Sequence, residues 1–366
     1  MDQQARTGLY DPPFVGDKTE TTPSLSVCIV TGRRIGVLSD CLASLQLQEN
    51  APPFELLVAA DADEEVAATV RAYFPDAEVC LVNKSLPGAA RNLLVERARG
   101  DLLLFLDDDV TVDERLLERL TALARRHPEV GVFGGPNDTP RGSSQFQVTQ
   151  GAVLASIVGS GPVRRRYGSH PARLADERFF TLCNLAIRRE VMVPFADDLV
   201  CAEENGVLAE LAHRGVAMLY DPGLVAYHER RATLRGFLVQ MHKYGRGRGQ
   251  LLTKAPRDVR PSFLAPTLLL AYLLASPLLI ALAGPAALIP LAVYLVAATV
   301  CGAWIALTLR RLGALPVAAA LIVLLHVAYG SGLPRGAFVG TGEEVAPVGD
   351  WLAMDEPRSV PSTDLA

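Results

Sequence analysis

The sequence predicts an α/β domain with a doubly wound, mixed but mostly parallel sheet, followed by a transmembrane α-helical region. Three observations lead to this prediction. Short apolar runs alternate with helical patterns between residues 25 and 106, three aspartates follow the last of these runs, and long uncharged apolar stretches begin near residue 264. Strands that alternate with helices form parallel sheets because each crossover helix packs on one face of the sheet.

Length and composition divide the chain into parts. Its 366 residues can hold a catalytic domain of about 250 residues with its own core. Half of the residues are hydrophobic, with the excess towards the C-terminal end, and the net charge of -5 gives no footprint for nucleic acid. We expect a flexible segment at 1–23, a catalytic domain at 24–250, a basic collar with three membrane helices at 251–334, and a disordered acidic tail at 335–366.

Four strands and three helices are expected in the first third of the chain. Each apolar run is bounded by Gly, Pro or charged residues, which is typical of strands buried on both faces. Parallel strands end at one edge of the sheet, where open α/β folds bind ligands. The strands are expected at 25–30, 54–60, 78–82 and 102–106, with helices around 38–45, at 66–73 and at 87–99.

Polar residues follow these strand ends: Thr31 and Arg33 after the first, Asp61 after the second and Arg91 after the third. An acid can accept hydrogen bonds from a base or ribose, whereas arginine and a helix N-terminus suit a diphosphate. We therefore expect these residues to bind a nucleotide. Each also has a plainer interpretation, with Asp61 as a turn residue, Arg33 as loop charge and Arg91 as a solvated helix residue.

Three carboxylates, Asp107, Asp108 and Asp109, end the fourth strand. Strand alternation lets Asp107 and Asp109 point the same way, with Asp108 opposed. Two converging carboxylates indicate a site for Mg²⁺ or Mn²⁺, whose other ligands would be water and the phosphates of a nucleoside diphosphate. The alternative is a solvated strand end or a cap for the helix that follows.

Three motifs, at 26–48, 88–92 and 105–109, resemble in their order and spacing the nucleotide-binding half of family 2 glycosyltransferases, which have the GT-A fold. The resemblance extends over 25–250. It implies an inverting, hexosyltransferase-like reaction with a nucleoside diphosphate sugar as the donor and the Asp107/Asp109 pair as the DxD metal motif. One departure is the loop after Thr31, which reads Gly-Arg-Arg where the family often has Tyr-Asn-Arg.

The resemblance also assigns roles in the second half of the domain. It implies that Glu204, the second acid of a pair, is the catalytic base and that Glu203 orients it, although the family more usually has Asp in the second place. Asn184 lies in a segment that resembles the approach to the acceptor site. From the residues alone, two acids ahead of a helix at 206–214 are ordinary dipole-stabilising residues.

A strand expected at 219–228 ends in His228, which in this fold can reach the metal or the diphosphate. A lone histidine is more often structural, so both interpretations stay open. The run at 164–166 consists of three arginines, which are either solvated loop charge or close to anionic head groups.

The basic segment 234–250 loosely resembles the Gln-x-x-Arg-Trp segment of membrane-bound relatives, which makes Gln240 an acceptor-binding candidate. Arg246 and Arg248 lie among glycines in this segment. Such a pattern is typical of a mobile cationic flap that binds a diphosphate, or of a basic collar at a bilayer surface.

Three nearly uncharged apolar stretches, at 264–283, 286–309 and 312–333, are each about twenty residues long, enough to span a bilayer. The alternative is three buried helices of a soluble domain. Basic residues precede the first stretch and separate the second from the third, so the positive-inside rule places the catalytic domain in the cytosol and the tail outside.

Together these observations predict a multi-pass enzyme of the inner or plasma membrane that transfers a sugar at the cytosolic face. The expected acceptor is lipid-linked or a glycan, as in polysaccharide assembly. Two other functions remain open: a non-catalytic nucleotide-binding membrane scaffold and a membrane-bound nucleotidyltransferase.

Overall fold

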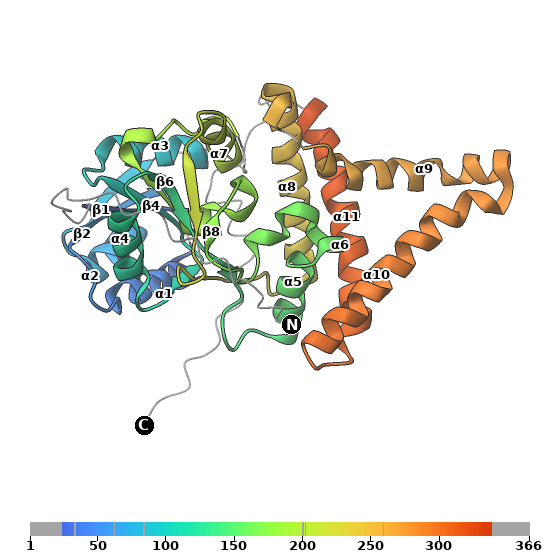
Figure 1. Cartoon of the computed structure of the whole chain (residues 1–366), viewed down its shortest axis with the longest axis horizontal. Coiled ribbons are helices and arrows are strands. Elements are labelled where there is room, and N and C mark those ends of the chain that lie inside the picture. The colour runs from blue at the N-terminus through green and yellow to red at the C-terminus, as the bar shows by residue number, and fades with distance from the viewer. Residues whose placement is uncertain are drawn as a thin grey trace, which may run out of the picture.

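The computed structural model describes residues 24–338, apart from 33, 62, 83–84, 200, 202 and 259. Segment 1–23 and most of segment 335–366, which were expected to be flexible, lie outside the described residues. Figure 1 shows a sheet-containing domain on one side, the long helices α8 (Leu234–Lys254) and α11 (Ala314–Phe338) beside it, and a helical hairpin that projects away from both.

The main sheet has eight strands, and its centre is built from segments distant in the sequence. Neighbouring strands β1, β2, β3 and β4 pair in parallel, as do β6 and β10. β9 runs antiparallel between β4 and β6. In spatial order the strands are β3 (Glu78–Val82), β2 (Phe54–Asp61), β1 (Leu25–Thr31), β4 (Leu102–Asp107), β9 (Leu185–Arg188), β6 (Val130–Gly134), β10 (Ala217–Tyr220) and β8 (Arg173–Leu174).

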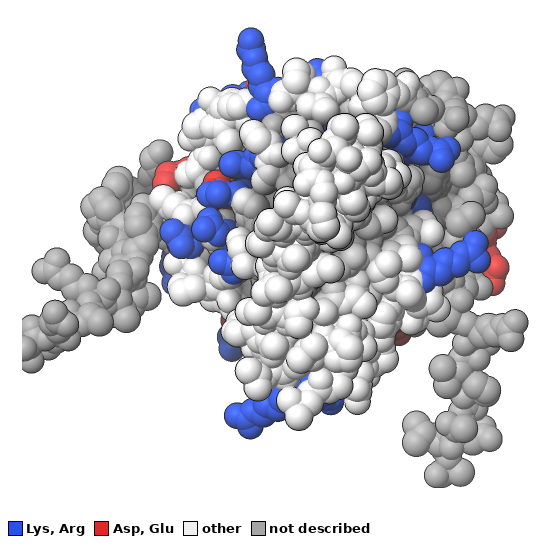
Figure 2. All heavy atoms as spheres, turned by 90° about the vertical axis from the view of Figure 1, so that its right-hand side faces the viewer, with Lys and Arg blue, Asp and Glu red and all other residues white. Residues whose placement is uncertain are grey.

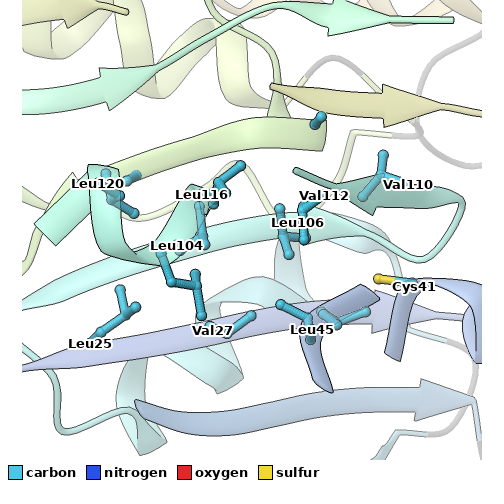
Figure 3. Close-up of a cluster of buried hydrophobic side chains, with 14 of the residues drawn as sticks. Leu25, Val27, Cys41, Leu45, Leu104, Leu106, Val110, Val112, Leu116 and Leu120 are labelled. Atoms are coloured by element: carbon cyan, nitrogen blue, oxygen red, sulfur yellow. The ribbon is translucent and has the colours of Figure 1, made fainter. Parts of the chain in front are cut away.

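A separate hydrophobic core covers each face of this sheet, because successive strand residues point to opposite sides. Val27 and Leu104 pack on one side, partly against Leu45 and Leu120 (Figure 3). Phe105 packs on the other side. The first core includes residues of α1 (Ile35–Gln46), α2 (Glu64–Tyr73) and α4 (Leu116–Arg126), and the second includes residues of α3 (Pro87–Arg97) and α7 (Glu204–His213). The predicted doubly wound, mostly parallel sheet is therefore confirmed.

A second, three-stranded sheet consists of β5 (Val110–Val112), β11 (Ala226–His228) and β7 (Asn137–Asp138). The single strand expected at 219–228 is wrong, since β10 and β11 belong to different sheets. The chain turns between them because the Asp221 side chain accepts a hydrogen bond from the Gly223 amide at 2.7 Å. This turn carries His228 to the end of β11, opposite Val110.

Helical segments join the sheets to the C-terminal part of the chain. α5 (Gln145–Leu154), α6 (Ile157–Ser160) and the 3-10 helix η1 (Gly161–Arg166) lie beside α8 (Leu234–Lys254) and α11 (Ala314–Phe338) (Figure 1). Buried side chains of α5, α8, α10 (Ile289–Thr308) and α11 form a third core. Because α11 continues to Phe338, the expected boundary at residue 334 is too early.

Among the described residues, two segments are long and apolar enough to cross a membrane by length and composition, Pro261–Thr308 and Ala314–Phe338. The first contains α9 (Ala265–Ala283) and α10, which form the projecting hairpin (Figure 1). Figure 2 faces this hairpin and shows an almost uncharged surface with Lys and Arg side chains around it. The three expected apolar stretches appear as α9, α10 and α11, and that each spans a bilayer stays a prediction.

Glycines let the backbones of α8 and α11 touch. A Cβ atom on Gly245 would lie 2.1 Å from the Tyr329 carbonyl oxygen, and one on Gly336 would lie 1.9 Å from that of Arg246. Gly249 makes a similar approach. Small residues spaced four apart are the usual means of such close helix packing. The glycines of segment 234–250 therefore lie in a helix, where they allow close packing of α8 against α11.

Candidate active site

One cavity of about 610 Å³ extends from the carboxyl ends of β1 and β4 to the apolar C-terminal helices. Its lining combines the predicted acidic residues with side chains from α8, α9 and α11. Two groups of charged residues lie in it, one around Asp109 and one around Glu204.

The metal candidates converge at the polar end of the cavity. Ligand atoms of Asp107, Asp109 and His228 all lie within 4.8 Å of one another. The convergence does not come from strand alternation, because β4 ends at Asp107 and the next two aspartates lie in the turn before β5. β11 pairs with β5 and brings His228 to this turn.

Cationic groups surround the aspartates. Arg34 donates hydrogen bonds to Asp108 and, at 3.0 Å, to Asp109. The Thr31 hydroxyl donates to Asp108 at 2.8 Å, and Arg231 lies 3.6 Å from Asp109. Burial alone would raise the pKa of Asp109, but His228 and Arg34 outweigh it and hold that pKa well below its usual range.

His228 is held by two partners. Its Nε2 lies 3.0 Å from Asp109 Oδ1, and its Nδ1 lies 3.2 Å from an Arg230 nitrogen. Arginine can only donate, so Nδ1 accepts and Nε2 carries the proton that it donates to Asp109. To coordinate a metal through Nε2, His228 would have to carry its proton on Nδ1 instead, and its hydrogen bond with Arg230 would be lost. The two carboxylates are ligands of the type that a hard divalent cation takes, and they would exchange contacts with Arg91, Arg34 and His228 for it. His228 fits after the change of tautomer.

Glu203 is tied to the metal candidates through one arginine. Arg91, near the start of α3, donates to Glu203 and, at 2.9 Å, to Asp107. Glu203 is 3 % exposed. Burial raises its pKa to about 7, although Arg91 opposes the shift. A carboxylate with a pKa near neutrality can exchange a proton under ordinary conditions.

Glu204 belongs to a second cluster. It accepts hydrogen bonds from Arg166 at 3.3 Å and from the Asn205 amide at 2.9 Å. Asn205 Oδ1 in turn accepts from Arg166 and from Arg248, each at 2.7 Å. Glu203 and Glu204 are thus adjacent in the sequence, but Glu203 pairs on the aspartate side and Glu204 pairs with the cluster that contains α8.

The remaining predicted site residues divide into two groups. Gln240 and Arg248 line the cavity with the acids. Among the described residues, the cavity lining does not include Asp61, Asn184 or Arg246. Asn184 is buried and donates to the Leu224 carbonyl, which indicates a structural role. Arg33 lies outside the described residues.

Three arginines of the cavity were missing from the predicted site: Arg34, Arg166 and Arg231. Arg34 lies between the end of a strand and the start of a helix, and this position in the sequence could have predicted that it belongs to the site. Arg166 ends a run of three arginines that pattern alone assigns to solvent, but it is 8 % exposed. Only the fold brings it to Glu204.

Comparisons with known proteins agree with this geometry. Residues 26–192 match the model of the family described as glycosyl transferase family 2. Over 158 residues the chain is 36% identical to the uncharacterized glycosyltransferase YwdF of Bacillus subtilis (strain 168), a match that covers 39% of this chain and 58% of YwdF.

A solved structure with a similar fold is the mannosyltransferase PcManGT from Pyrobaculum calidifontis, in complex with GDP-Man and Mn²⁺. It has a TM-score of 0.54 and 18% sequence identity, and the match covers 90% of this chain and 91% of that one. Residues 26–192 therefore form a glycosyl transferase family 2 domain, and the chain has a GT-A-like fold.

Proposed function

We propose that the protein is a membrane-anchored, metal-dependent inverting glycosyltransferase that moves a sugar from a nucleoside diphosphate sugar to the hydroxyl of a lipid-linked acceptor at the cytosolic face. One observation carries the proposal. The Asp107/Asp109 pair, the buried acids Glu203 and Glu204, and the apolar helices line a single cavity.

The donor binds at the aspartate end. Arg91 and Arg34, which pair with carboxylates, are placed to contact a diphosphate. Thr31, Arg33, Asp61 and Asp108 bind the rest of the nucleotide. Asp107 and Asp109 hold Mg²⁺ or Mn²⁺, with His228 as a third ligand. When bound, the cation offsets the negative charge that develops on the leaving diphosphate. The Mn²⁺ in the PcManGT complex supports a divalent cation with this fold.

Glu204 removes the proton of the acceptor hydroxyl. Glu203, which the resemblance gave the role of orienting Glu204, instead holds Arg91 on the donor side. The hydroxyl then attacks the anomeric carbon from the face opposite the diphosphate, which inverts its configuration. Two contacts support this division. Glu204 pairs with Arg166 and Asn205, away from the aspartates, whereas Glu203 shares Arg91 with Asp107.

The membrane part of the proposal rests on the two apolar segments and on the charges at their ends. Lys254, Arg257 and Arg260 precede α9, and Arg310 and Arg311 lie between α10 and α11. Basic residues flank spans on the cytosolic side, so the family domain and the loop after α10 lie there. Polysaccharide assembly on a lipid carrier needs a site in this position.

The test is to incubate the purified full chain with several nucleotide sugars, Mn²⁺ and a membrane lipid extract, and to identify the released product. Free nucleoside diphosphate that depends on the metal supports sugar transfer. Pyrophosphate would instead identify a nucleotidyltransferase. Nucleotide binding without either product would identify a non-catalytic scaffold, and both results would contradict the proposal.

A further inference from the structure

Two buried arginines in the cavity lie in one cluster, and only one of them is paired with a carboxylate. Arg166 from η1 and Arg248 from α8 are each 7–8 % exposed, and both donate to Asn205 Oδ1. Glu204 is the carboxylate that lies beside them, and it accepts from Arg166 at 3.3 Å. The Nε atom of Arg166 is buried and has no hydrogen-bond partner among the described residues. Burial of this kind is costly for a cation unless an anion compensates it.

The other cavity charges do not supply that anion. Asp108 and Asp109 pair with Arg34, while Asp107 and Glu203 share Arg91. Burial lowers the pKa of Arg248, and the nearby Arg166 acts in the same direction, while Tyr329 and Glu204 oppose the shift. The cluster around Glu204 therefore carries an excess positive charge. A metal-bound donor diphosphate at the aspartates would leave this excess in place.

The cluster stands where the polar part of the cavity meets its apolar part. The Arg248 guanidinium lies 4.3 Å from the centroid of the Phe263 ring, just ahead of α9. The lining also includes apolar side chains of the neighbouring helices: Ile157 and Val158 from α6, Leu269 from α9 and Leu325 from α11. On the outer side of α9, Leu268 is 66 % exposed. The cavity wall is thus also part of the apolar outer surface.

We propose that Arg166 and Arg248 bind the phosphate of a lipid acceptor, whose hydrocarbon chain runs along the apolar part of the cavity towards α9 and α11. The proposal rests on the proposed sugar transfer and names the acceptor class for it: an amphiphile with a phosphate head. It also moves Arg248 from the donor, where the sequence placed it, to the acceptor. Glu204, which accepts from Arg166 at this phosphate site, is then beside the acceptor hydroxyl.

Equilibrium binding to the full chain in phosphatidylcholine nanodiscs tests the proposal, with radiolabelled farnesyl phosphate as the probe and farnesol and inorganic phosphate as competitors. Wild-type protein should bind farnesyl phosphate at least about tenfold more tightly than either competitor, because only it fills both parts of the site. Arg166→Gln and Arg248→Gln should each weaken farnesyl phosphate binding about tenfold or more, as expected for lost charged hydrogen bonds. Arg125→Gln, an exposed arginine on α4 outside the cavity, is the matched control and should change nothing.

A further variant covers the case in which the Gln variants fail to fold. Val158→Trp fills the apolar part and should weaken farnesyl phosphate binding while leaving the affinity for UDP or GDP with Mn²⁺ within about twofold. The two Gln variants should likewise keep that nucleotide affinity.

Three results would overturn the site. The first is equal affinity for farnesol and farnesyl phosphate, and the second is unchanged farnesyl phosphate binding in the variants. The third is a loss of nucleotide affinity in the Gln variants as large as their loss of farnesyl phosphate affinity, which would assign the arginines to the donor site. A failure of the proposed function would give a different result from a failure of this site. The protein would still bind farnesyl phosphate in preference to farnesol, but it would release no nucleoside diphosphate from any nucleotide sugar.

Discussion

Exchange of each acid for its amide separates the roles of Glu203 and Glu204. Glu204→Gln is nearly isosteric and keeps an oxygen that can accept from Arg166 and Asn205, so the fold and donor affinity should be preserved. If Glu204 is the base, transfer should fall about 10²- to 10⁴-fold, the usual contribution of a positioned general base. Glu203→Gln should cost less, since it loses only part of the charge that holds Arg91.

The pH dependence gives a second, independent readout. With a pKa of about 7, Glu203 is about one tenth ionised at pH 6 and about nine tenths ionised at pH 8. Its charge orients Arg91 beside Asp107. In wild-type protein kcat/KM should therefore rise about tenfold from pH 6 to pH 8 through this group. Glu203→Gln should remove the rise, whereas Glu204→Gln should keep it at a much lower rate.

The assay measures donor affinity by titration and transfer by release of nucleoside diphosphate, on both variants over this pH range. A larger rate loss in Glu203→Gln than in Glu204→Gln would reverse the assignment. Loss of donor affinity in Glu204→Gln would make that residue part of the donor site. Small losses in both variants would refute a base in this pair.

Three other predictions test the metal site, the helix contact and the topology. Asp107→Asn should weaken Mn²⁺-dependent nucleotide binding at least about tenfold with little change in the melting temperature, because few protein carboxylates hold the cation; binding indifferent to EDTA would contradict it. Gly336→Ala should lower the unfolding free energy by about 1–3 kcal/mol, since its Cβ would lie 1.9 Å from a backbone oxygen. Gly206→Ala is the control, because a Cβ atom built at Gly206 has no other atom within 4 Å. This variant should raise the unfolding free energy by up to about 1 kcal/mol. Equal shifts of the unfolding free energy in both variants would disprove the α8–α11 contact. A reporter fused after residue 355 should be found outside the cell and one placed before residue 23 inside, and a cytosolic tail would mean that one apolar stretch does not span.

The part of the fold that follows from local pattern could be predicted from the sequence. β1, β2, β3 and β4 are short apolar runs with charged or Gly boundaries, and their periodicity alone sets their bounds to within a residue or two. The aspartates after β4 were likewise visible, although their convergence depends on a turn and on β11. β11 reaches this turn because it pairs with β5 after the chain has turned at Asp221, and a pattern of hydrophobicity shows neither the turn nor the pairing.

The part of the site that depends on distant pairing could not be predicted. Arg166 and Glu204 are far apart in the chain, and each has a solvated interpretation when taken alone. The glycines of α8 were difficult for another reason. A glycine-rich composition favours a flexible segment, whereas in the structure these glycines lie in a helix and contact the backbone of α11. Gly245 meets Tyr329 on a helix that begins much later in the chain. The secondary-structure propensity of a short segment cannot predict which distant helix will pack against it.

The position of β9 has a consequence for how the chain acquires its structure. β4 is among the most apolar strands, and on one side it pairs with β1 early in synthesis. Its other side stays open until β9 has been made, after all of β6, α5 and α6. During that interval the nascent domain exposes a long hydrophobic strand edge, which is a template for wrong pairing and aggregation. Mutations that slow the docking of β9 should thus reduce the yield of folded protein even where the final stability is unchanged.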